Sequence, residues 1–123
     1  MSVPQVARKI VTAIPGPKSE ALKAEHTRYV SAGVGQGMPV FAETASGSTI
    51  TDVDGNRFID LASGIAVTGV GNCAPEVVAA VREEVAKLTH TNFATTPYAN
   101  YIEVCKKLDE HTPVSYTHLT LPT

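Results

Sequence analysis

The chain has 123 residues, 43% of them hydrophobic, and its ten lysines and arginines against twelve aspartates and glutamates give a formal net charge of −2. This balance disfavours a nucleic acid or an anionic membrane as partner, and no apolar run approaches the roughly 18 residues that a membrane-spanning helix needs. Charges and prolines interrupt the first apolar segments, which makes them a poor signal peptide. Cys73 and Cys105 have neither metal-ligand spacing nor the density of a disulfide framework. We therefore expect a cytoplasmic protein that binds neither nucleic acid nor membrane.

The first predicted elements are an extended arm and a helix. The run Ile14-Pro-Gly-Pro17 interrupts any regular structure, so residues 1–18 are expected to form an N-terminal arm. Ser19 predicts the N-cap of a helix over residues 19–30. The glycine-rich segment 31–37 follows no predicted strand and precedes no Gly-Lys-Ser/Thr, so it indicates a flexible loop rather than a phosphate cradle.

A β-hairpin is the next predicted element. Two β-prone segments, residues 48–53 and 56–61, flank Asp54-Gly55, which is a strong signal for a two-residue hairpin turn. We expect the buried side of the hairpin to consist of Ile50, Phe58 and Leu61.

Two further helices are predicted after the hairpin. Pro75 suits the first position of a helix over residues 75–88, and Glu76 favours the positive end of that helix. Its apolar stripe would be formed by Val77, Val78, Val81, Val85 and Leu88. The pair Thr96-Pro97 predicts the start of another helix over residues 97–108.

The last ten residues, 114–123, differ from the rest of the chain. They read VSYTHLTLPT, carry no charge, and do not continue the helical pattern. One codon choice for them spells a transposase-type sequencing adapter read in frame. We therefore expect a non-native tail at 114–123, and the alternative is a genuine β-prone tail.

The hairpin and the segment after it carry a family resemblance. Asp52-Val-Asp-Gly55, Phe58-Ile-Asp60 and Gly64-Ile-Ala-Val67 resemble the amino-terminal part of class III (ω-amino acid) aminotransferases, which use pyridoxal phosphate. Asn72-Cys73-Ala74 is similar to the branch that acts on 4-aminobutyrate. The resemblance implies an α+β fold: a truncated, amino-terminal small-domain segment of a fold type I pyridoxal-phosphate-dependent transferase, with residues 19–113 reaching the start of the large domain.

The same resemblance implies substrate-binding residues. Gly64 and Ile65 would lie against the aliphatic stem of an amino acid, and the alternative for Ile65 is ordinary core packing. Asn92 and Phe93 are weaker candidates in a loop near the pocket entrance. No residue is assigned to catalysis, to cofactor binding or to a metal, because none of the six lysines has the family's Schiff-base environment.

The resemblance also implies the chemistry of a longer parent protein. That parent would be a pyridoxal-phosphate-dependent homodimer that moves an amino group from an ω-amino acid to 2-oxoglutarate, giving succinate semialdehyde and glutamate from 4-aminobutyrate. This chain itself is expected to be inactive and not to bind the cofactor. The alternatives are another class III aminotransferase (ornithine, acetylornithine or diamine), a glutamate-semialdehyde aminomutase, or a small non-catalytic α/β interaction module.

Overall fold

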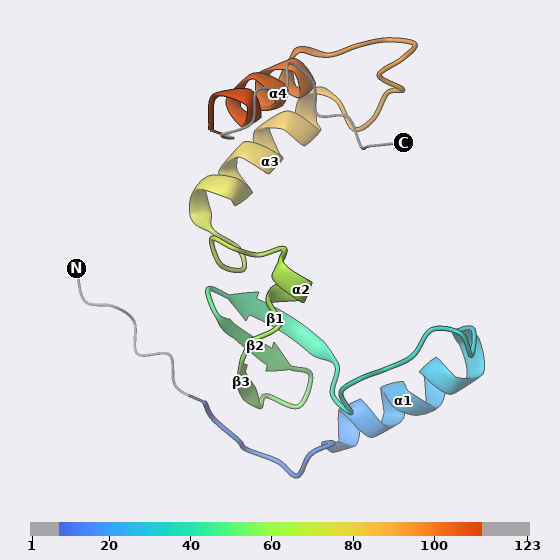
Figure 1. Ribbon diagram of the computed structural model, residues 1–123. Coiled ribbons are helices and arrows are strands. Elements are labelled where there is room, and N and C mark those ends of the chain that lie inside the picture. The colour runs from blue at the N-terminus through green and yellow to red at the C-terminus, as the bar shows by residue number, and fades with distance from the viewer. Residues whose placement is uncertain (1–7, 112–123) are drawn as a thin grey trace, which may run out of the picture. The chain divides into compact units, whose positions relative to one another are not determined.

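A computed structural model describes residues 8–111 (Figure 1). The described residues fall into two compact units, which meet in the chain between Val81 and Arg82. The first seven residues of the predicted arm and the whole of the predicted tail at 114–123 lie outside the described residues.

The first helix is α1, Pro17–Tyr29, and it begins two residues earlier than predicted. Gly16 is its N-cap and Pro17 takes the first helical position, where a missing N–H costs nothing. The prediction of Ser19 as N-cap is therefore wrong, since Ser19 lies inside the first turn and is fully buried. The free N–H groups of that turn are bound by a distant carboxylate, described below.

The sheet has three antiparallel strands, β1 (Ala42–Ser46), β2 (Thr49–Asp52) and β3 (Arg57–Ile59), in the order β1-β2-β3. The predicted hairpin is confirmed, with Thr49 opposite Ile59 and Thr51 opposite Arg57. Its turn differs from the prediction, because the backbone N–H of Asp52 bonds to the carbonyl of Asn56. The loop thus has three residues, and its last one, Gly55, has a φ of +87° that favours glycine.

The arm extends this sheet. Lys9 pairs with Arg57 through two backbone hydrogen bonds of 3.0 and 2.7 Å, on the edge of β3 that no named strand occupies. Residues 9–12 are thereby attached to the hairpin. The sequence of the arm does not predict this long-range contact.

The buried positions of the described residues are polar. Ser19, Asp52 and Asn56 are fully buried, and no hydrophobic side chain within residues 8–111 reaches that state. Ile50 and Phe58 face each other and are half-buried, as the hairpin pattern predicts. The prediction for Leu61 is wrong: β3 ends at Ile59, the chain turns at Asp60, and Leu61 is 91% exposed.

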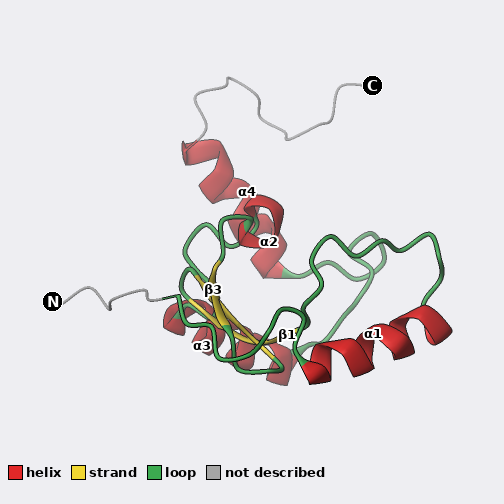
Figure 2. Ribbon diagram, turned by 90° about the horizontal axis from the view of Figure 1, so that it is seen from below, coloured by secondary structure: helices red, strands yellow, loops and turns green. Residues whose placement is uncertain are grey.

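Three helical segments follow, α2 (Ser63–Ala66), α3 (Pro75–Lys87) and α4 (Ala99–His111), and Figure 2 shows the loops between the elements in green. Pro75 does begin α3, which confirms that prediction, whereas α4 begins two residues after Pro97. The single turn α2 was not predicted. The apolar residues of α3 and α4 are largely exposed within the described structure, among them Val77, Val81, Val85, Tyr101, Ile102 and Leu108.

Candidate functional site

The loop formed by residues 60–72, which connects β3 to the start of α3, carries the predicted substrate residues. Asp60 anchors its first end, because one carboxylate oxygen, Oδ1, accepts the backbone N–H groups of Ala62 (3.0 Å) and Ser63 (2.8 Å). The other oxygen, Oδ2, accepts a 3.3 Å hydrogen bond from the side-chain amide of Asn72. One carboxylate therefore contacts both ends of the loop.

The second end is joined to the turn between β1 and β2. Gly47 and Asn72 exchange two backbone hydrogen bonds of 2.9 and 2.8 Å. Gly71 has a φ of +93°, and a Cβ atom there would lie 3.0 Å from the Cα of Gly47. Glycine at 71 is thus needed both for its backbone conformation and for this close approach.

The tip of the loop is a left-handed turn. Ser63, Gly64, Ile65 and Ala66 have φ values of +49°, +62°, +61° and +62°. This conformation costs about 1–2 kcal/mol for each residue other than glycine, and it is a genuine outlier for a β-branched side chain. The N–H groups of Ile65 and Ala66 both bond to the carbonyl of Ala62, at 2.6 and 3.0 Å.

The Ile65 side chain at this tip is 88% exposed. Within residues 8–111, where no hydrophobic side chain is fully buried, Ile65 does not pack into a core. An exposed apolar side chain on a strained and anchored turn is an arrangement found at ligand-contacting positions. Gly64 lies beside it and adds no side chain of its own.

A buried polar network supports the hairpin that carries this loop. The carbonyl oxygen of the Asn56 side chain accepts the N–H groups of Val11 (2.8 Å) and Thr12 (3.0 Å). Its amide donates to the Thr12 hydroxyl (2.8 Å) and to the Asp52 carboxylate (2.9 Å). All four hydrogen bonds of this side chain are satisfied, so the arm and the hairpin turn hold one geometry.

Asp54 attaches α1 to the same turn. Its carboxylate accepts the backbone N–H groups of Lys18 (2.8 Å) and Ser19 (2.9 Å) and the hydroxyl of Ser19 (2.6 Å). Desolvation alone would raise the pKa of Asp54, but the bonds from Ser19 and Lys18 outweigh it and hold the pKa below its ordinary value of 3.8. The carboxylate thus serves as the helix cap that Ser19 was expected to be.

The weaker candidates, Asn92 and Phe93, lie in the second compact unit and have local partners there. The Asn92 side-chain oxygen accepts the backbone N–H groups of Ala94 (3.0 Å) and Thr95 (3.3 Å), which closes a turn. Phe93 contacts Tyr98 edge-on and Tyr101 in a tilted arrangement, with ring centroids 5.4 and 4.4 Å apart. Both side chains hold the loop between α3 and α4 in shape.

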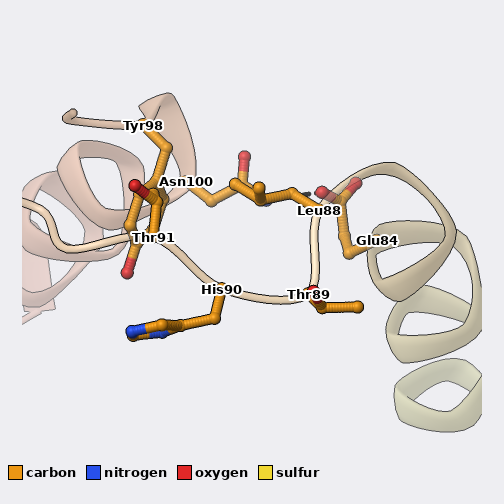
Figure 3. Close-up of a pocket in the computed structure, with 7 residues that line it drawn as sticks. All are labelled: Glu84, Leu88, Thr89, His90, Thr91, Tyr98 and Asn100. Carbon is orange, nitrogen blue, oxygen red and sulfur yellow. Dashed lines mark hydrogen bonds between the residues drawn. The ribbon is translucent and has the colours of Figure 1, made fainter.

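A shallow pocket of about 230 Å³ lies in the same unit (Figure 3). Glu84 accepts a 2.8 Å hydrogen bond from the Asn100 amide and a 2.9 Å bond from Lys87, and the Lys87 and Asn100 bonds lower the pKa of Glu84. The lining residues are Glu84, Leu88, Thr89, His90, Thr91, Tyr98 and Asn100. Figure 3 shows the His90 ring directed away from the Glu84–Asn100 pair, so no acid–base pair is assembled there.

Neither Lys87 nor Lys23 has the environment that a Schiff-base lysine needs. A Schiff-base lysine must reach its neutral form and therefore needs a lowered pKa. Lys87 instead donates hydrogen bonds to Glu83 and Glu84, and these bonds raise the pKa of Lys87. Lys23 donates to Gln36 on the surface. Among residues 8–111 no group of three histidine, cysteine or acidic side chains could hold a metal ion. No helix in that range is long and apolar enough to cross a bilayer.

Comparison with known proteins places the chain in a family. The sequence profile described as Aminotransferase class-III matches residues 29–121. The chain is 53% identical over 111 residues to 4-aminobutyrate aminotransferase of Mycobacterium tuberculosis and 42% identical over 103 residues to 5-aminovalerate aminotransferase of Pseudomonas putida. These alignments cover 90% and 84% of the chain but only 25% and 24% of the relatives. This chain belongs to the class III aminotransferase family, and it spans about a quarter of the length of these relatives.

Solved structures agree on the fold. Ornithine aminotransferase of Toxoplasma gondii matches with a TM-score of 0.65 and 25% identity, over 79% of this chain and 22% of that one. Ornithine δ-aminotransferase of Plasmodium falciparum matches with the same score and 22% identity, over 75% and 23%. The predicted fold class, a segment of a pyridoxal-phosphate-dependent transferase, is confirmed.

Sequence reasoning missed the residues that hold the loop: Gly47, Asp60 and Asn72. Asp60 carried a usable signal, since an aspartate just before a loop commonly binds backbone N–H groups two or three residues ahead. The pairing of Gly47 with Asn72 joins residues that are 25 positions apart and had no local signal.

Proposed function

We propose that this chain is the amino-terminal part of an aminotransferase that moves the amino group of 4-aminobutyrate to 2-oxoglutarate. The observation that carries the proposal is the 53% identity with 4-aminobutyrate aminotransferases over 90% of the chain. The products would be succinate semialdehyde and glutamate. The whole protein would be a cytoplasmic homodimer with pyridoxal phosphate as cofactor, bound by residues other than those described here.

Within this proposal the Gly64–Ile65 tip is the substrate-side wall. Ile65 offers an apolar surface without a polar group, which suits the methylene chain between the two ends of an ω-amino acid. Its exposure and its strained, anchored turn support this role. Asn92 and Phe93 remain the weaker candidates, and in this proposal they would contribute to the pocket entrance from the loop between α3 and α4.

The main alternative is an aminotransferase that uses a different amino donor. The Pseudomonas relatives named for 5-aminovalerate are 42% identical, compared with 53% for the mycobacterial relatives named for 4-aminobutyrate, and this difference favours 4-aminobutyrate. An ornithine-type donor and a non-catalytic module have less support.

The test uses the protein encoded by the complete open reading frame that contains this sequence. Purified protein is supplied with pyridoxal phosphate, 2-oxoglutarate and 4-aminobutyrate, 5-aminovalerate or ornithine in turn, and glutamate formation is measured. We expect the highest kcat/KM with 4-aminobutyrate. A higher kcat/KM with another donor would show that 4-aminobutyrate is not the preferred substrate. No turnover with any donor would refute the proposed activity.

Two companion measurements address the chain itself. Purified 1–123, treated with pyridoxal phosphate and borohydride, should give no lysine adduct of defined stoichiometry by mass spectrometry. Resequencing the gene tests the proposal that residues 114–123 are adapter-derived, because genomic codons for those ten residues would contradict it.

A further inference from the structure

We propose that Asp60 is a positioning residue that, together with Asn72, holds the Ile65 tip in its left-handed turn and thereby sets the affinity for the amino donor. This inference rests on the proposed function. It concerns residues that the family resemblance did not assign to the site.

The backbone of Asp60 is fixed by the hairpin. Its N–H donates a 2.8 Å hydrogen bond to the carbonyl of Ser48, one residue before β2. The carboxylate then extends from the end of β3 to the first N–H groups of the loop, those of Ala62 and Ser63. The sheet is thus connected to the tip through a single charged side chain, whose hydrogen bonds are stronger than neutral ones.

The tip needs such support because its conformation is unfavourable. Ser63, Ile65 and Ala66 all have positive φ, which residues other than glycine avoid when nothing holds them. The pairing of Gly47 with Asn72 fixes the far end of the loop. Without the Asp60 carboxylate, Ala62 and Ser63 lose their acceptor and the tip can relax toward right-handed backbone, which would redirect the Ile65 side chain.

The test variant is Asp60→Asn in the protein of the complete open reading frame. It retains one oxygen for Ala62 and Ser63 but loses the charge, and it places an amide opposite the amide of Asn72. We expect KM for 4-aminobutyrate to rise about tenfold, the scale of one poorly placed apolar contact, while kcat changes less than about threefold. Partial unfolding would instead lower kcat and leave KM unchanged.

Two further variants sharpen the result. The double variant Asp60→Asn with Asn72→Asp again places a hydrogen-bond donor opposite an acceptor. Its KM for 4-aminobutyrate should return close to the wild-type value. Glu43→Gln, an exposed acidic residue on β1, is the neutral control and should leave both constants unchanged. Hydrogen exchange of the peptide covering residues 60–72 gives a readout independent of activity, and D60N should accelerate it about tenfold.

The outcomes separate the two proposals. An inactive wild-type protein refutes the proposed function and, with it, the substrate role of the tip. An active wild type whose D60N variant keeps its KM, or whose loop exchanges at the unchanged rate, refutes the positioning role alone. A raised KM, faster exchange and recovery in the double variant support it.

Discussion

Each of the two compact units is stabilised internally by a different kind of interaction. In residues 8–81, side chains join segments 35 to 45 positions apart, as in the bonds from Asp54 to Ser19 and from Asn56 to Val11. In residues 82–111, the ion pairs of Lys87 with Glu83 and Glu84 join neighbours on one helix. The first unit therefore fixes its shape through buried polar contacts, whereas the second relies on local helix formation and one aromatic cluster.

This difference predicts where substitutions are costly. A buried amide with four partners cannot be removed without leaving other polar groups unsatisfied, while an exposed ion pair contributes little. Native-state hydrogen exchange on the protein of the complete open reading frame measures these costs, because it resolves local opening segment by segment.

Asn56→Ala should have the largest effect. The N–H groups of Val11 and Thr12 and one oxygen of the buried Asp52 then lose their hydrogen bonds to Asn56. This loss should lower the opening free energy of the arm and hairpin by about 3 kcal/mol. Asn100→Ala in the second unit is the matched control, with no resolved change expected. Equal effects of the two substitutions would contradict the view that polar side-chain contacts stabilise the first unit more than the second.

Gly16→Ala should come next. Gly16 is buried, and a Cβ atom there would lie 2.7 Å from both Cβ and Oδ2 of Asp54. Overpacking of this kind costs about 1–3 kcal/mol, and it should appear as faster exchange at the start of α1. Gly35→Ala meets nothing within 4 Å and should be neutral; a neutral Gly16→Ala would show that the junction is loosely packed.

The attachment of α1 should depend on pH through Asp54. Because its pKa is lowered in the folded state, its contribution is present above the ordinary value of 3.8 and is lost as pH falls through the lower, folded pKa. Exchange at Lys18 and Ser19, corrected for intrinsic pH effects, should therefore accelerate on acidification below about pH 4. Asp54→Asn should weaken the attachment and remove this pH dependence; a dependence that persists in the variant would implicate another group.

Lys87→Gln should have the smallest effect. Its partners Glu83 and Glu84 are exposed, so salt and water screen both pairs. Exchange in α3 should stay within about twofold of the wild type. A larger change that vanishes in 1 M salt would mean that the second unit is more electrostatically organised than its geometry indicates.

Local sequence patterns predicted the hairpin and the helices well. They did not predict the contacts between residues far apart in the sequence. Asp54-Gly55 predicted the hairpin and Pro75 predicted α3, since each depends on a few neighbouring residues. Ser19 is a residue type that commonly caps helices, yet Asp54 fills that role from 35 residues away. Leu61 has the apolar character expected of the buried side of the hairpin, but β3 ends before it and Asp60 binds the loop.

The candidate site was predictable only in part. The resemblance pointed to Gly64 and Ile65, and the structure places them on an exposed tip. Its left-handed backbone could not be predicted, because serine, isoleucine and alanine all disfavour positive φ. The turn exists because Asp60 and the Gly47–Asn72 pairing hold its ends, and those contacts form only when the sheet does.

The polar character of the buried positions has a thermodynamic consequence. Ser19, Asp52 and Asn56 have the fully buried side chains of residues 8–111, so local opening of the arm and hairpin exposes peptide and amide surface more than hydrocarbon. Apolar exposure raises the heat capacity of unfolding and polar exposure lowers it. Opening of this region should therefore have a small heat-capacity increment, and its stability should vary with temperature along a nearly straight line rather than a pronounced dome.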